Sequence, residues 1–77
     1  MNLYRVWAYR TDSRSIDEQY YIVLAPDKDM AKELASKEPR DHNDVAFRVA
    51  GEIHGDFTGP PQVLGHCESG TWIWLGP

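Results

Sequence analysis

The 77-residue sequence predicts a single α+β domain, in which one helix packs on one face of a small antiparallel sheet. Two segments near the N-terminus are rich in aromatic and β-branched residues, an amphipathic segment follows them, and strand-like segments punctuated by glycine and proline complete the chain. A chain of this length builds only one core, because it buries only about 60% of the surface that its unfolded form exposes. The expected order is β-β-α-β followed by a C-terminal β-hairpin, in one domain over residues 1–77.

The first two strands are expected at residues 3–10, LYRVWAYR, and at residues 19–25, QYYIVLA, with a polar loop between them. Alternate residues of a strand point to opposite faces, so large apolar side chains fall on both faces of this hairpin in either register. One short helix covers only one face. The second face therefore requires another layer, either the C-terminal hairpin or a partner.

The segment PDKDMAKELASKEP predicts a helix from about Lys28 to Lys37. Asp27 is suited to cap its N-terminus, and the negative charge of Asp29 is favourable in its first turn. Pro39 disfavours helical backbone at the residue before it, which ends the helix. The apolar residues follow helical spacing and are expected to pack on the sheet: Met30, Ala31, Leu34 and Ala35.

A third strand is expected at residues 45–53, VAFRVAGEI, where Val45, Phe47 and Val49 alternate with smaller or polar residues. Gly51 marks a bulge or a bend in this strand. The next segment, HGDFTGPPQ, contains two glycines and two consecutive prolines and is expected to be a loop. QVLGHC and TWIWL then flank ESG, a pattern typical of a short hairpin.

The C-terminal segment TWIWL places Trp72 and Trp74 on one face of a strand and Ile73 on the other. Trp and Tyr are enriched at the energetic centres of protein interfaces. We therefore predict an interface at the aromatic strands, with a target protein or with a second copy of the chain in a homodimer; the alternative is that the two tryptophans complete the core. The predicted partner-binding residues are Trp72, Trp74, Trp7, Tyr9 and Tyr20.

The charge balance argues against a nucleic-acid-binding protein. Eight Lys and Arg face twelve Asp and Glu, for a formal net charge of −4, whereas proteins that bind phosphate backbones usually present a basic patch. The alternative is a small single-stranded nucleic-acid-binding domain in which Trp7, Tyr9 and Tyr20 stack on bases.

Composition also predicts the compartment. No apolar run approaches the roughly 20 residues of a membrane-spanning helix, and MNLYRVWAYRTD lacks the features of a secretory leader. Cys67 is the single cysteine, so no intramolecular disulfide is expected. We expect a soluble, cytoplasmic protein without membrane contact.

Metal and catalytic motifs are not evident in the sequence. The histidines His42, His54 and His66 are twelve residues apart, and adjacent residues such as His66 and Cys67 point in opposite directions on a strand. No nucleophile elbow, glycine-rich phosphate loop or paired-cysteine motif is present. We therefore expect no catalytic residue, metal or cofactor; the alternative is a metal-binding or enzymatic domain built on His54, His66 and Cys67.

The opening MNLYRVWAYR, the acidic loop, the segment YYIVLAPDKDMAKELA and a third strand ending in VAGEI resemble the small ββαβ proteins that phages and prophages encode, among them anti-CRISPR and other anti-defence inhibitors. The resemblance covers residues 1–53 and rests on the pattern of elements. It implies a non-enzymatic, acidic protein that inhibits a host defence complex by occupying a surface on it, in the host cytoplasm. It assigns no site residue, because the group shares no site motif.

Overall fold

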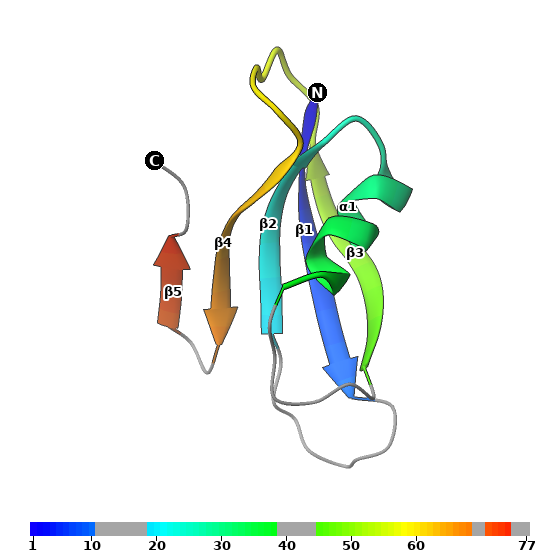
Figure 1. The fold of residues 1–77 in the computed structure, drawn as a ribbon, viewed down its shortest axis with the longest axis vertical. Helices are drawn as coiled ribbons and strands as arrows, with labels where there is room; N and C mark the ends of the chain where they lie inside the picture. Colours follow the sequence, from blue (N-terminus) through cyan, green and yellow to red (C-terminus); the bar gives the residue numbers. More distant parts are fainter. Residues whose placement is uncertain (11–18, 39–44, 69–70, 75–77) are drawn as a thin grey trace.

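The structure, a computed structural model, describes residues 1–10, 19–38, 45–68 and 71–74 (Figure 1). Five strands form one sheet in the order β3-β1-β2-β4-β5, and every neighbouring pair is antiparallel. The α+β class, with an antiparallel sheet and one helix, is thereby confirmed. The elements are β1 (Asn2–Arg10), β2 (Gln19–Ala25), α1 (Lys28–Ser36), β3 (Val45–Ile53), β4 (Gln62–Glu68) and β5 (Thr71–Trp74).

The core lies between the helix and one face of the sheet. In the β1–β2 pairing, Tyr4 is opposite Val23 and Val6 is opposite Tyr21, so their side chains point to the same face. Val6 and Val23 are completely buried there. The buried cluster on this face consists of Tyr4, Val6, Ala8, Tyr21, Val23, Ala25, Ala31 and Ala35.

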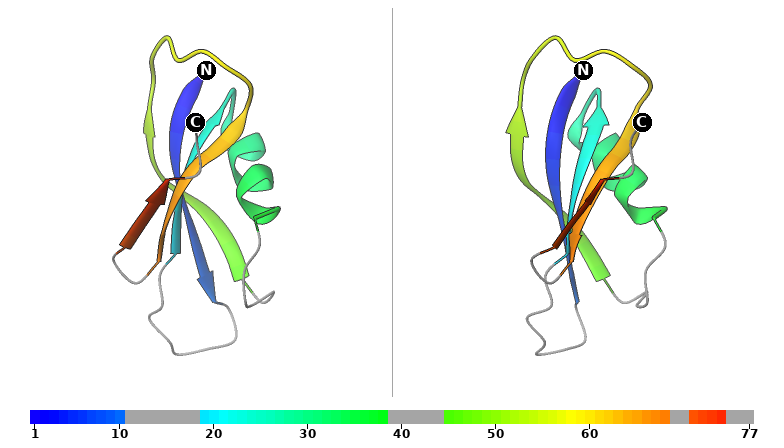
Figure 2. Two further views of the ribbon diagram at one scale, coloured as in Figure 1. Left: turned by 60° about the vertical axis from the view of Figure 1, so that its left-hand side comes forward. Right: turned by 90° about the vertical axis from the view of Figure 1, so that its left-hand side faces the viewer.

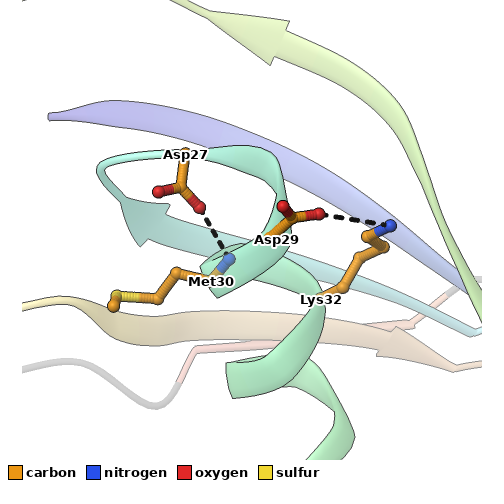
Figure 3. A network of polar contacts seen from close by, with 4 residues as sticks. All are labelled: Asp27, Asp29, Met30 and Lys32. Carbon is orange, nitrogen blue, oxygen red and sulfur yellow. Dashed lines mark hydrogen bonds and ion pairs between the residues drawn. The ribbon is translucent and has the colours of Figure 1, made fainter.

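The helix α1 begins where the sequence predicts. The carboxylate of Asp27 accepts a hydrogen bond of 2.8 Å from the backbone N–H of Met30, which satisfies one of the donors left free at a helix N-terminus (Figure 3). Asp29 and Lys32 form an exposed ion pair one turn apart, at 3.8 Å. The helix therefore owes its start to a local sequence signal, independent of the sheet.

Two alanines form the closest contact between helix and sheet. Ala31 and Ala35 are fully buried, and Leu34 packs against the same cluster while remaining partly exposed. Met30 was expected in this contact, but it is 36% exposed. Successive residues of a helix are rotated by 100°, so Ala31, Leu34 and Ala35 face the sheet and Met30 lies at the edge of this apolar stripe. Figures 1 and 2 show the helix on one side of the twisted sheet.

A β-bulge in β3 changes which face its residues occupy. Val6 pairs with Val49, whereas Arg5 pairs with Gly51, so Ala50 is the extra residue. The expected irregularity thus falls immediately before Gly51. Without the bulge, Ile53 would share the helix-covered face with Val49; with it, Ile53 turns to the opposite face, where it is 61% exposed.

The segment between β3 and β4 folds over one end of the sheet. The N-terminal ammonium of Met1 donates a hydrogen bond of 3.2 Å to the carbonyl oxygen of Phe57. Gly59 has φ of 118°, a conformation that favours glycine, and its backbone approaches the side chain of Leu24. This contact helps to bury Leu24, although Leu24 belongs to the face opposite the helix.

Candidate interaction surface on the open face of the sheet

We call the sheet face opposite α1 the open face. Across the described ranges, no helix covers it, and the loop before β4 reaches only its end near Leu24 (Figure 2). The register of β1 with β2 and β3 places eleven residues on this face: Leu3, Arg5, Trp7, Tyr9, Tyr20, Ile22, Leu24, Ala46, Arg48, Gly51 and Ile53. Among the described residues, the open face therefore presents a set of large apolar groups without a second layer over them.

An aromatic cluster occupies the middle of the open face. Trp7 and Tyr9 are two residues apart on β1, and their ring centroids are 4.7 Å apart. Trp7 pairs with Tyr20 across the β1–β2 ladder, and these two rings stack with centroids 6.5 Å apart. The Arg5 guanidinium carbon lies 5.3 Å from the centroid of the Tyr20 ring, a cation–π distance. Strand alternation and cross-strand pairing together assemble this cluster from residues distant in sequence.

A hollow lies beside the aromatic cluster, at the position where Gly51 lacks a side chain. Its volume is about 300 Å³. Gly51 is opposite Arg5, and Arg5 is opposite Ile22, so the three residues lie side by side on neighbouring strands. The residues lining the hollow are Leu3, Tyr4, Arg5, Ile22, Gly51, Glu52 and Ile53.

The charges on the open face differ in sign from the charge of the whole chain. Among the eleven residues that define the face, the two that carry charge are Arg5 and Arg48, and both are exposed. The chain as a whole has a formal net charge of −4. Two cationic groups therefore lie on the face whose large apolar side chains are mostly half-buried.

The indole nitrogen of Trp7 is buried and has no hydrogen-bond partner among the described residues. A buried donor without an acceptor costs about 1 to 3 kcal/mol, and unsatisfied groups of this kind are few in native proteins. The aromatic cluster is thus held at some expense to the stability of the domain.

The structure brings together three of the five predicted partner-binding residues, namely Trp7, Tyr9 and Tyr20. For the other two, it describes the backbone alone: Trp72 pairs with Cys67, and Trp74 pairs with Gly65. Their side chains lie outside the described part of the structure, so whether they form core or interface stays a prediction.

Sequence reasoning missed the hollow. Its walls come from Leu3, Ile22 and Ile53, which the sequence alone did not place on one face, because the bulge in β3 determines the position of Ile53. A signal was present in Gly51: glycine within a strand often marks a bulge or a place where another group approaches closely.

The residues of the alternative metal or catalytic site lie apart. His54 follows β3 and is exposed, with its Nε2 3.4 Å from Oε1 of Glu52. His66 and Cys67 are on β4, which is separated from β3 by both β1 and β2, and they pair with Tyr21 and Tyr20 respectively. Within the described ranges, no group of three or more His, Cys, Asp or Glu side chains is placed to hold a metal ion.

Comparison of the chain with protein-family models, curated proteins and solved structures found no match. The part of the chain that the structure describes includes no helix with the length and apolar character needed to cross a membrane.

Proposed function

We propose that this chain is a non-enzymatic protein-binding module whose open face docks on a partner protein. The observation that supports the proposal is the half-buried aromatic cluster of Trp7, Tyr9 and Tyr20, beside the hollow at Gly51. In line with the phage-protein resemblance, we propose a host defence complex as the partner and inhibition by surface occupation as the effect of binding.

The physical basis is the cost of leaving such a surface in water. Aromatic side chains bury large areas with few rotatable bonds, so they contribute strongly to association when a partner excludes water from them. Contiguous exposed apolar patches on soluble proteins commonly mark interaction sites. The helix covers the opposite face, and among the described residues no second layer covers the open face, which supports the open face as the docking surface.

The test is quantitative capture of a partner from bacterial lysate by the tagged chain and two variants. Tyr9→Ala removes one ring of the aromatic cluster, and Lys28→Ala changes an exposed helix residue elsewhere. We expect wild type and Lys28→Ala to retain the same protein, and Tyr9→Ala to bind it about 30-fold more weakly, the loss expected for a hot-spot residue. Equal retention by all three chains, with circular dichroism showing each folded, would contradict the proposal.

A second candidate is single-stranded nucleic-acid binding, favoured by the position of Arg5 over Tyr20 next to Trp7. Aromatic rings beside cationic side chains are the usual elements of a base-stacking platform. The discriminating measurement is the tryptophan fluorescence of the chain titrated with a 15-residue oligothymidylate at two salt concentrations. Binding that weakens steeply with salt would favour this candidate over the first.

A further inference from the structure

We infer that the open face recognises an acidic segment of a partner protein, which inserts one large apolar side chain into the hollow at Gly51 and places carboxylates beside Arg5 and Arg48. This inference rests on the proposed function and specifies the chemistry of its partner. Three features of the open face support it, namely the shape of the hollow, the sign of the charges around it, and the poor fit of the other occupants.

The hollow has the size and lining of a receptor for one side chain. A Cβ atom placed on Gly51 would lie 4.0 Å from Cβ of Arg5, an ordinary contact distance, so the absence of a side chain there opens real space. Leu3, Ile22 and Ile53 make its walls apolar. A volume of about 300 Å³ is at the lower end of the range for ligand pockets, which suits a single large aliphatic or aromatic side chain.

The charges beside the hollow are mixed, with Arg5 and Glu52 in its lining and Arg48 close by, and the excess of cations favours carboxylates. Arg5 is directly opposite Gly51, and Arg48 is opposite Trp7, the next residue on the same face of β1. Both arginine side chains are exposed, so they are available to a partner without disrupting the core. Guanidinium groups bind carboxylates through paired hydrogen bonds, which adds direction to the attraction.

A second copy of the chain is a poorer occupant of this face. In a symmetric face-to-face dimer, the same patch meets itself, so two patches that each hold Arg5, Arg48 and one Glu52 would meet with an excess of positive charge. Like charges brought together across an interface oppose association. Nucleic acid also fits less well, because two arginines neutralise few phosphates, the chain carries a net charge of −4, and stacked bases would leave the hollow unfilled.

The experiment is selection of a displayed library of random 12-residue peptides on the immobilised wild-type chain. We expect enriched peptides to combine one large apolar residue with an excess of Asp and Glu. Individual peptides should bind Gly51→Leu at least tenfold more weakly than wild type, because the added side chain fills the hollow. Lys28→Leu, which adds the same side chain on the exposed surface of the helix, should bind as wild type does.

The role of the two arginines is tested by reversing their charge. The Arg5→Glu, Arg48→Glu double variant should bind acidic peptides at least tenfold more weakly, and replacement of peptide Glu by Lys should restore binding. Ile53→Asp provides a second way to disturb the hollow should Gly51→Leu lose its fold, since Ile53 is 61% exposed.

The outcomes separate the inference from the proposed function. Peptides that depend on Tyr9 and Gly51 but show no acidic excess would overturn the inference and leave the protein-binding function standing. Peptides insensitive to every open-face variant would overturn both. An absence of enriched peptides, oligothymidylate binding that Gly51→Leu abolishes, or a wild-type dimer that the same variant dissociates in sedimentation would each overturn the inference.

Discussion

The two faces of the sheet differ in how completely their side chains are buried. The face under the helix is closely packed: Val6, Val23, Ala31 and Ala35 are fully buried, and the rings of Tyr4 and Tyr21 are buried with them. The open face carries Trp7, Tyr9 and Tyr20, which keep partial exposure beside two arginines. Aromatic rings thus lie on both faces, and the faces differ in how completely those rings are buried.

This difference indicates how stability and binding are divided over the molecule. Small side chains let the helix approach the sheet closely, and close packing there determines the fold. The half-buried rings of the open face contribute less to stability, and Trp7 has an indole donor without a partner among the described residues. The comparison predicts that substitutions on the helix-covered face affect folding first and that those on the open face affect binding first.

The largest expected effect comes from introducing the same charge on each face. Val23→Asp buries a carboxylate without a partner and should unfold the domain, because the cost exceeds the stability of about 5 kcal/mol expected for so small a protein. Ile53→Asp, at a position 61% exposed on the open face, should change the unfolding free energy by no more than about 0.5 kcal/mol. Thermal unfolding of both variants, followed by circular dichroism, measures the difference. Equal melting temperatures would contradict the prediction that the two faces contribute differently to stability.

A smaller loss is expected at the margin of the helix contact. Leu34→Ala removes a side chain that packs against the core but is partly exposed, so we expect a loss of about 2 kcal/mol, at the low end for leucine truncation. The measurement is urea unfolding at constant temperature. Met30→Ala serves as the control, because Met30 is more exposed and should lose less; the reverse order would mean that the helix is rotated relative to the sheet.

The elements of the fold were predictable because each has a local signal. The bounds of β2 and β3 agree with the expected ranges 19–25 and 45–53, where β-branched and aromatic residues alternate. Asp27 likewise marks the helix start by itself. The strand order was not predictable in this way, because β4 pairs with β2 through contacts between residues some forty positions apart, and no local pattern encodes them.

The candidate site was predictable only where strand alternation suffices. Trp7 and Tyr9 share a face by their spacing alone, and the adjoining strand brings Tyr20 to them. The hollow needs the bulge at Ala50, which moves Gly51 and Ile53 to the open face. The amino-acid composition of a strand does not indicate a one-residue shift in its register. This part of the site is therefore known only from the strand pairing in the structure.

The two glycines near the ends of the open face should respond oppositely to alanine. Gly59→Ala should lose about 1 to 2 kcal/mol, because φ of 118° is unfavourable for a residue with a Cβ atom. Gly51→Ala should be neutral or stabilising by up to about 1 kcal/mol, since its Cβ meets only ordinary contact and alanine reduces the entropy of the unfolded chain. Urea unfolding measures both. Destabilisation by Gly51→Ala would mean that its backbone is strained and that the hollow cannot be filled without cost.

The smallest effect is expected at the centre of the aromatic cluster. Trp7→Phe removes the indole N–H, whose burial without an acceptor costs about 1 to 3 kcal/mol, together with some apolar contact area, which is lost at about 25 cal/mol per Å². Because these terms oppose each other, we expect the unfolding free energy to change by less than about 1 kcal/mol. Trp7→Ala loses the whole ring and should be clearly less stable than Trp7→Phe. If both variants lose the same unfolding free energy, removal of the N–H brings no compensating gain, which would mean that the indole nitrogen has an acceptor in the native protein. If Trp7→Phe is nearly neutral for folding but weakens capture of the partner, then tryptophan at this position serves binding at the expense of stability, as the contrast between the faces requires.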